Sequence, residues 1–533
     1  MADSGSGGLG GDFADDFADQ DDVDDERACT AVAVVDEGEP EPTGLPEFAR
    51  LPVYAIAAAV GLVLLAVAGK FGYFGDELYF LATGKHQWAW GYADNPWLLP
   101  WLAKSMDALF PGSWFALRII PLLLTSAGVV VSALIAREFG GGRKAQVITA
   151  GAYALAWQIL ASGHVMATST VDPFLWVLVS WLVVRWVRTR SDWLLVGAGL
   201  ATAVAMQGKF LIAFLWVGII VGVLVAGPRD LLRRPALWAG GVVTVVVTLP
   251  TLLWQVDNDW PYLLMQEVIK EQNARLLGGT LGTIPLAVAM AGLPIGAFLL
   301  CHGLYTLFRA PELRPYRFLG WAVAVVTVIV LVFANRYYYV AGMYPILFAA
   351  SALRIEAGRT AAWWRWVPSW PVFALSVPVA VYLTLPVRPV DGFTGVDLVD
   401  FQASGSLGWP EVAETAADVY RSLPSQADTV VMGDSYWQAS ALDYYGRQRG
   451  LPDAYGPERG YWFTGRPVDT TQQVIYVGGT QEWLSQFFGD VRRVDTIRLP
   501  QTSAKTANQG VPVYVLKAPV APWPELWERM HRP

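Results

Sequence analysis

The sequence predicts an α-helical membrane protein of about eleven transmembrane helices that carries a small α/β domain at its C-terminal end. The first observation is composition: 54% of the 533 residues are hydrophobic and only 16% are charged, whereas an average soluble domain carries roughly 25% charged residues. The second is a series of apolar stretches near the length of about 20 residues that a membrane-spanning helix needs. The third is a change to alternating helix and strand patterns from about residue 390. An ordinary soluble enzyme is therefore excluded.

The N-terminal segment differs from the rest of the chain. Residues 1–41 hold 14 Asp and Glu and one Arg, a local charge of −13 against −8 for the whole chain, so the remaining body is slightly basic. Its apolar content is too low to offset the entropy of ordering. We therefore predict a disordered, acidic, cytoplasmic tail over residues 1–48.

Apolar periodicity over residues 49–388 predicts the transmembrane domain. The first span is not a cleaved signal peptide, because the acidic leader replaces a basic n-region and no small-residue cleavage site follows. The approximate limits of the predicted spans are 51–69, 114–136, 145–161, 171–187, 193–206, 210–226, 236–254, 283–305, 318–334, 338–354 and 367–386.

Arg and Lys are unevenly distributed among the predicted loops. Alternate loops hold clusters of them, which marks those loops as cytoplasmic. The clusters are Arg137, Arg143 and Lys144; Arg185, Arg188 and Arg190; Arg229, Arg233 and Arg234; Arg309, Arg314 and Arg317; and Arg359 and Arg365. This pattern predicts a multi-pass protein of the cytoplasmic membrane, with its N-terminus inside and residues 389–533 outside the cell.

The remaining charged and polar residues of the membrane domain gather on the predicted outer side. They include Asp76, Glu77 and Asp94 in loop 70–113, Asp172 at the outer start of the fourth span, Lys209, Arg275 in loop 255–282, and Arg336. A carrier would instead place polar groups near the membrane midplane. The one-sided distribution therefore favours an active site at the outer surface. Loop 255–282 is a candidate lid over that site.

The last segment, residues 389–533, predicts a small extracytoplasmic α/β domain. Helices are expected over 411–423, 435–448, 481–488 and 524–530, and strands over 428–433, 473–479, 491–499 and 512–517. Its turns match no phosphate-binding loop, so we expect no nucleotide site and no nucleic acid partner. The two cysteines and four histidines of the chain are too scattered for a zinc motif.

Two adjacent carboxylates, Asp76 and Glu77, directly follow the first span within GYFGDELYFLATGKHQWAWGYADNPWLLPW. Neighbouring residues point about 100° apart on a helix. Only one of the two is therefore expected to face a reaction centre, and the other to hold a backbone amide, a cation or a neighbouring helix.

The order of motifs resembles a known family. GDE after the first span, WGYADNPW, ATSTVDPF and NRYYYVAGMYP are similar to the GT-C glycosyltransferases, and within them to glycosyltransferase family 39. That family includes bacterial relatives of the protein O-mannosyltransferases and of the lipid A aminoarabinose transferase. The resemblance covers about residues 50–390, and ALDYYG and RGYWFTGRP in the outer domain resemble the tail of a bacterial subfamily. Asn95-Pro96-Trp97 departs from the family, whose members often carry His-Pro-Pro there.

The resemblance implies a glycosyltransferase that moves a monosaccharide from a polyprenyl-phosphate donor to an extracytoplasmic acceptor, with inversion at the anomeric carbon. Asp76 matches the catalytic base and Glu77 its usual neighbour, so both are candidate catalytic residues. The implied substrate-binding residues are Asp94, Asp172, Lys209, Arg275, Arg336 and Tyr338, with the cations holding the lipid phosphate. A glycan, a lipid or a protein is the implied acceptor, and membrane lipid a further partner.

Other interpretations of the same residues stay open. Asp172 precedes Pro173 and is a candidate N-cap, Lys209 a candidate snorkelling lysine, and Arg336 a candidate lipid anchor. A divalent cation shared by Asp76, Glu77 and Asp172 is also open, although no spacing rule supports it. The whole chain has two rival interpretations, a lipid or glycan transporter or flippase, and a non-catalytic cell-wall scaffold.

Overall fold

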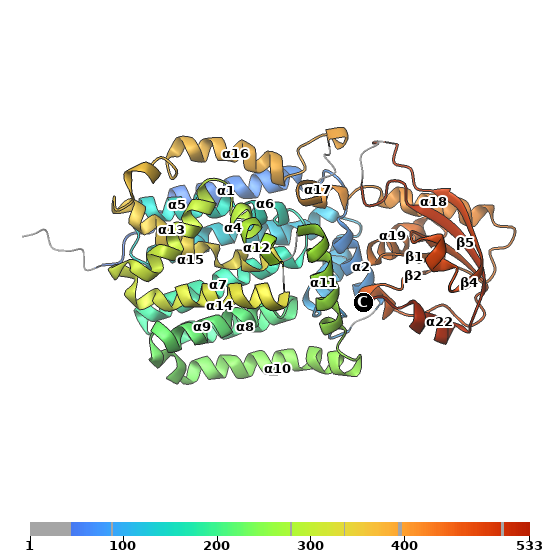
Figure 1. Cartoon of the computed structure of the whole chain (residues 1–533), viewed down its shortest axis with the longest axis horizontal. Helices are drawn as coiled ribbons and strands as arrows, with labels where there is room; N and C mark the ends of the chain where they lie inside the picture. Colours follow the sequence, from blue (N-terminus) through green and yellow to red (C-terminus); the bar gives the residue numbers. More distant parts are fainter. Residues whose placement is uncertain are drawn as a thin grey trace, which may run out of the picture. The chain divides into compact units, whose positions relative to one another are not determined.

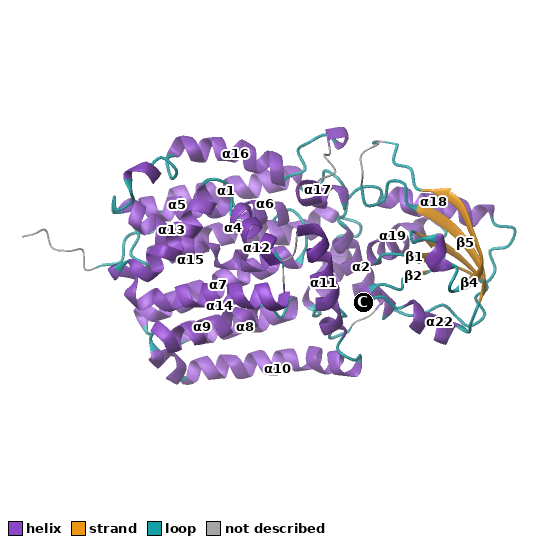
Figure 2. Cartoon of the chain, in the orientation of Figure 1, coloured by secondary structure: helices purple, strands orange, loops and turns teal. Residues whose placement is uncertain are grey.

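The structure is a computed structural model that describes residues 44–86, 89–277, 280–334, 336–392, 397–500, 502 and 506–533. The acidic stretch of the predicted tail, residues 1–43, lies outside the described residues. Figure 1 shows the long apolar helices running alongside one another, and Figure 2 shows that the strands belong to the C-terminal part of the chain. The predicted fold class, a helical membrane protein with a small α/β domain, is confirmed.

The apolar helices coincide with the predicted spans. They are α1 (Arg50–Val67), α4 (Trp114–Glu138), α5 (Arg143–Ala154), α6 (Trp157–Ser162), α7 (Thr168–Thr189), α8 (Trp193–Gly208), α9 (Ile212–Ala226), α10 (Pro235–Asp257), α12 (Thr280–Met290), α13 (Ile295–Arg309), α14 (Arg317–Ile329), α15 (Tyr344–Glu356) and α16 (Trp370–Thr384). The span predicted over 145–161 is interrupted between α5 and α6, and that over 283–305 consists of α12 and α13.

Length and hydropathy separate these helices into classes. Among the described residues, five helices are long and apolar enough to cross a membrane, and a sixth span results if the pair α12 and α13, bent by 111°, counts as one. The apolar helices α8, α9 and α16 are shorter. The chain is a multi-pass membrane protein, and the number of about eleven spans stays a prediction.

Apolar side chains that face away from the bundle indicate which solvent surrounds it. Only 17% of the most apolar 18-residue stretch of α10 is buried inside the protein. Trp238, Val242 and Val245 of this helix are exposed. A row of exposed valines and tryptophans would be unfavourable in water. Lipid is the solvent that fits this surface.

Small residues allow the helices to approach closely. A Cβ atom on Gly222 of α9 would lie 2.1 Å from the carbonyl oxygen of Phe318 on α14, and one on Gly218 would lie 2.8 Å from that of Ala322. Glycines four residues apart let two backbones touch, which is a common basis of helix pairing in membranes. Gly199 of α8 and Gly240 of α10 meet in the same way.

The Arg-rich and Lys-rich loops meet at one end of the bundle. Nε of Arg188 lies 2.6 Å from a carboxylate oxygen of Glu138, and Nη1 of Arg190 lies 2.5 Å from one of Asp230. Glu356 accepts a 2.6 Å hydrogen bond from the Gly142 amide. We call this the basic end. Its existence agrees with the expected cytoplasmic side, whose assignment stays a prediction.

Within the described part of residues 49–388, three further α-helices do not belong to the apolar set. They are α2 (Gly75–His86), α3 (Leu98–Leu109) and α11 (Pro261–Leu277). Leu78 and Phe80 of α2 belong to one buried core together with Val412 and Leu442 of the C-terminal part. The first loop and the C-terminal domain therefore fold against each other.

The C-terminal domain contains a five-stranded sheet of order β2-β1-β3-β5-β4. β1 is parallel to β2 and β3, whereas β5 is antiparallel to β3 and β4. The strands are β1 (Thr429–Gly433), β2 (Ala454–Tyr455), β3 (Gln473–Val477), β4 (Phe488–Thr496) and β5 (Pro512–Pro519), and the helices are α17 (Asp397–Ser404), α18 (Trp409–Ser422), α19 (Tyr436–Gly446), α20 (Arg459–Trp462), α21 (Gln481–Leu484) and α22 (Trp523–Met530). Patterns predicted seven of these elements closely, α21 is shorter than expected, and α17, α20 and β2 were not predicted.

Candidate active site

A small cavity of about 90 Å³ lies opposite the basic end, where α2, α11 and the ends of α7 and α8 meet the C-terminal domain. Its charged and hydroxyl-bearing lining comes from segments far apart in the sequence. These residues are Asp76, Tyr79, Asp94, Thr168, Lys209, Tyr262, Arg336, Tyr338, Tyr339 and Arg459. Five of the eight predicted site residues are among them, so the structure brings Asp76, Asp94, Lys209, Arg336 and Tyr338 together.

Asp76 is the second residue of α2, where the positive end of the helix dipole favours a carboxylate. Its Oδ1 accepts hydrogen bonds from the Tyr436 hydroxyl at 2.9 Å and from the Trp437 indole Nε1 at 2.8 Å. A Cβ on Gly75 would lie 2.3 Å from the Trp437 ring, so only glycine permits this approach. The C-terminal domain thereby orients the carboxylate of the first loop.

Glu77 points away from this cavity and is completely buried. It forms a salt bridge with Arg118 at 2.6 Å and accepts hydrogen bonds from the amides of Phe74 and Met166, at 2.8 and 2.9 Å. Arg118 also donates to the Ala68 carbonyl. The expected catalytic role of Glu77 is therefore corrected: its carboxylate ties α2 to α4 and to the segment before α7. Glu77 thus behaves as predicted for one of the two neighbouring carboxylates: it binds a cation and backbone amides.

Asp94 belongs to a second buried group in the cavity wall. It accepts a 2.8 Å hydrogen bond from the Tyr79 hydroxyl and lies 4.0 Å from Nη1 of Arg459. Burial raises the pKa of Asp94, and the positive charge of Arg459 opposes that rise. The Arg459 guanidinium also stacks over the Tyr436 ring at 4.3 Å. Arg459 therefore joins Asp94 to the residue that orients Asp76.

Three residues of the site, Arg459, Tyr436 and Trp437, were not predicted from the sequence. Arg459 opens RGYWFTGRP, which carried the resemblance of the outer domain but suggested no role. A Cβ on its neighbour Gly460 would lie 1.9 Å from the Tyr79 hydroxyl, so this segment packs directly on α2. The glycine and the aromatic residues of RGYW were the only features of the sequence that could have indicated close packing of this segment on α2.

Lys209 and Arg336 supply positive charge from the membrane domain. Lys209 follows α8, and its Nζ lies 4.8 Å from the centre of the Tyr339 ring. Arg336 and Tyr338 line the same cavity from the segment before α15. Lys209 is thus packed on an aromatic ring inside the protein, which does not fit a snorkelling lysine, and Arg336 faces the cavity, which does not fit a lipid anchor.

Asp172 lies one turn inside α7, whose N-cap is Ala167, so the N-cap interpretation of Asp172 is wrong. It is 7% exposed and does not line the cavity. Its predicted role in substrate binding stays a prediction. Arg275 falls in α11, in a stretch whose side chains lie outside the described residues.

Helix α11 covers one wall of the cavity with Tyr262, Met265 and Gln266. Its start is attached through Gln255, which donates to the Tyr92 carbonyl at 3.0 Å and accepts from the Tyr262 amide at 3.1 Å. Most of the described part of loop 255–282 is thus the helix α11, placed over the site. Its action as a lid stays a prediction.

The described residues contain no group of three His, Cys, Asp or Glu side chains that is arranged as a metal site. Asp76 accepts hydrogen bonds from aromatic residues of the C-terminal domain, and Glu77 pairs with Arg118. A divalent cation shared by Asp76, Glu77 and Asp172 stays a hypothesis.

Comparisons with known proteins agree with the predicted fold. Residues 94–254 match the family model of the Dolichyl-phosphate-mannose-protein mannosyltransferase. The fold is similar to that of ArnT from Cupriavidus metallidurans in the apo state, with a TM-score of 0.59, 18% identity, and coverage of 90% of this chain and 98% of that one. This chain has the GT-C fold. ArnT bound to undecaprenyl phosphate is similar as well, with a TM-score of 0.56, 18% identity, and coverage of 86% and 97%. The predicted resemblance to GT-C glycosyltransferases of family 39 is confirmed.

The two kinds of similarity extend over different parts of the chain. Asp94, Asp172 and Lys209 lie inside the segment matched by the family model. The similarity to ArnT covers most of both chains. No curated protein sequence shows significant similarity to the chain.

Proposed function

We propose that this protein is an integral membrane glycosyltransferase that moves a sugar from a polyprenyl-phosphate-linked donor to an acceptor at the outer membrane surface. The observation that carries the proposal is the cavity in which Asp76 is grouped with Lys209, Arg336 and Arg459 at one end of an apolar bundle. A lipid-linked phosphate needs an apolar path for its chain and cations for its charge. One similar structure, that of ArnT, holds undecaprenyl phosphate.

Lys209 and Arg336 are the groups that we assign to the departing phosphate. When the bond to the anomeric carbon breaks, negative charge accumulates on the phosphate oxygens. Cations that are already in place stabilise this charge, an effect worth a few kcal/mol per group in a site screened from water. Tyr338 and Tyr339 line the same cavity, and the Tyr339 ring packs against Lys209.

Asp76 is the group that we assign as the general base. An acceptor hydroxyl is too weakly acidic to react unaided, and a positioned carboxylate that takes its proton accelerates transfer by roughly 10²- to 10⁴-fold. Tyr436 and Trp437 both donate to Oδ1, which orients the carboxylate toward the cavity that Asp76 lines. Attack by the acceptor on the face opposite the phosphate would invert the anomeric configuration.

The position of these charges argues against a carrier. Asp76, Asp94 and Arg459 belong to segments outside the apolar helices, and Lys209 and Arg336 adjoin helix ends. A transporter or flippase would hold its substrate near mid-span. A scaffold would have no use for a carboxylate oriented by two aromatic donors.

The test is transfer of radiolabelled sugar from a panel of polyprenyl-phosphate donors, using membranes that contain the full chain. Asp76→Asn should lower transfer at least 10²-fold while the protein inserts normally. Asp257→Asn is the matched control, because Asp257 is an exposed carboxylate at the end of α10. Full activity of Asp76→Asn would refute the base assignment, and the absence of transfer from every donor in wild-type membranes would refute the function.

The cations are tested separately with Lys209→Gln and Arg336→Gln. Each should reduce transfer by about 10²-fold, because each removes one stabilising charge from the leaving phosphate. Arg233→Gln, at the basic end, is the control with the same change of charge and should transfer normally. Equal losses in all three variants would show a general effect of charge rather than phosphate binding.

A further inference from the structure

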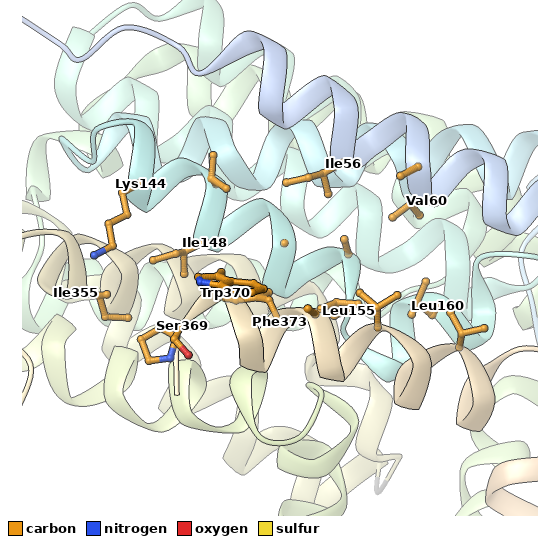
Figure 3. A pocket seen from close by; sticks show the side chains of 18 of the residues that line it. Ile56, Val60, Lys144, Ile148, Leu155, Leu160, Ile355, Ser369, Trp370 and Phe373 are labelled. Carbon is orange, nitrogen blue, oxygen red and sulfur yellow. The ribbon is translucent and has the colours of Figure 1, made fainter. Parts of the chain in front are cut away.

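A second and much larger cavity lies near the basic end, between α16 and the pair α1 and α5. Its volume is about 950 Å³. Its walls are apolar, with Ile56 and Val60 on α1, Ile148 on α5, and Phe373 on α16 (Figure 3). We call it the α16 groove. It shares no lining residue with the candidate active site.

The polar side chains of the α16 groove gather at one end. Figure 3 shows Lys144 and Ser369 at this end and Val60 and Leu160 at the other. Lys144 is the second residue of α5, and Arg365 lies just before α16, so both cations belong to the basic end. The groove is therefore an apolar channel with a cationic mouth.

Two hydroxyl groups at the mouth have unused hydrogen-bonding capacity. Thr360 is only 5% exposed, and its Oγ1 has no hydrogen-bond partner among the described residues. A buried hydroxyl without a partner is costly unless a ligand supplies one. Ser369 is the N-cap of α16, yet its side chain makes no capping hydrogen bond. The positive end of the α16 dipole therefore opens at the same mouth.

The two cations are also available to a ligand. Among the described residues, no carboxylate pairs with Lys144 or Arg365. The neighbouring carboxylate Glu356 instead accepts hydrogen bonds from the amides of Gly142 and Lys144. An anion at the mouth would thus meet two positive charges, a buried hydroxyl donor and a helix N-terminus.

We propose that the α16 groove binds an anionic diacyl glycerophospholipid of the leaflet at the basic end. The phosphate lies among Lys144, Arg365 and Thr360, and the acyl chains lie along α16. From Trp370 to Val381 the helix rises about 17 Å at 1.5 Å per residue, slightly more than half of the ~30 Å hydrocarbon core. The groove therefore extends through one leaflet, as an acyl chain does.

The charge and position of the mouth select this lipid over two others. A zwitterionic lipid would bring an ammonium group toward Lys144 and Arg365 and lose part of the attraction. The polyprenyl-phosphate donor needs its phosphate beside Lys209 and Arg336, at the opposite end of the bundle. The occupant is thus a structural lipid rather than the sugar donor.

The experiment is native mass spectrometry of the full-length protein in mild detergent, titrated with phosphatidylglycerol, with phosphatidylcholine of the same chains, and with undecaprenyl phosphate. Wild-type protein should retain phosphatidylglycerol at least tenfold more tightly than phosphatidylcholine. The double variant Lys144→Gln/Arg365→Gln should lose this preference. Ala59→Trp, which fills the groove without changing charge, should weaken both phospholipids at least tenfold.

The matched control is Arg233→Gln/Arg314→Gln, which removes two exposed cations from the same end outside the groove. It should bind phosphatidylglycerol as the wild type does, and all variants should elute as one species in gel filtration. Equal loss in the control pair, or no preference for phosphatidylglycerol in the wild type, would overturn the proposal. The proposal would also be overturned if undecaprenyl phosphate displaced phosphatidylglycerol and if Ala59→Trp abolished the binding of undecaprenyl phosphate.

Discussion

At the scale of single residues, Asp76 and Glu77 show how two neighbours of the same chemistry acquire different tasks. The helix turns about 100° between them, so one faces the cavity and the other the packed interior. Asp76 accepts hydrogen bonds from the C-terminal domain, whereas Glu77 neutralises Arg118 with no exposure to solvent. We infer that one carboxylate serves the reaction and the other holds the fold.

Glu77→Gln tests the second task. The substitution keeps the shape of the side chain but leaves Arg118 buried without a counter-charge, which typically costs about 3–5 kcal/mol. We expect a much lower unfolding temperature in detergent and a low yield of folded protein. Asp76→Asn, one residue away, should unfold near the wild-type temperature, and equal unfolding temperatures for the two variants would contradict the division of tasks.

Trp437→Phe tests whether the C-terminal domain orients the base. Phenylalanine preserves the contact with the Phe74 ring, at 5.2 Å between ring centres, but cannot donate to Asp76. A hydrogen bond to a charged group is worth about 1.5–3 kcal/mol. We therefore expect transfer to fall roughly tenfold or more, measured as initial rate at saturating donor.

Tyr444→Phe provides the comparison for Trp437→Phe on the same helix. The Tyr444 hydroxyl bonds Tyr73 at 3.3 Å and does not reach Asp76. It should leave transfer nearly unchanged. If both variants transfer sugar at the wild-type rate, the orientation of Asp76 does not depend on the indole of Trp437.

At the scale of elements, the crossing of α8 and α10 depends on two facing glycines. A Cβ on Gly240 would lie 2.9 Å from the Cα of Gly199, whereas one on Gly241 would meet nothing within 4 Å. Gly240→Ala should therefore push the helices apart and destabilise the protein by about 1–3 kcal/mol. Gly241→Ala should be neutral or slightly stabilising, because alanine favours the helix. Thermal unfolding of both variants in detergent distinguishes these outcomes.

Element positions were largely predictable because they depend on local composition. The apolar runs became helices, and Pro and Gly near their ends mark many of the boundaries. The interruption between α5 and α6 and the 111° bend between α12 and α13 were not predicted. An apolar pattern records burial or contact with lipid, but the direction in which a helix continues depends on what it packs against.

At the scale of the whole molecule, the basic loops and the charged residues of the candidate site lie at opposite ends of the helical bundle. The basic loops contact one another at one end, and the candidate site lies at the other. The excess of Arg and Lys predicts that the basic end is cytoplasmic. The site would then act on acceptors outside the cell.

Labelling of single cysteines in intact cells tests this topology. In a variant with Cys29 and Cys301 replaced by Ser, Lys517→Cys in β5 should react with a membrane-impermeant maleimide, because the predicted topology places the C-terminal domain outside. Arg233→Cys at the basic end should react only after the membrane is opened. Both side chains are exposed, so accessibility within the protein is matched. The reverse labelling pattern would invert the orientation and move the reaction to the cytoplasm.

The sequence by itself determined that lipid surrounds much of the protein and where most elements lie. It also indicated five site residues that line one cavity in the structure. It did so because composition and periodicity are local properties, and because the resemblance to the GT-C family was carried by short motifs. Only the tertiary structure decided that Glu77 binds Arg118 and that Tyr436, Trp437 and Arg459 complete the site. Tyr436 and Trp437 lie 360 and 361 positions from Asp76. Contacts over such separations arise when α2 and α19 bury a common core, which no local pattern records.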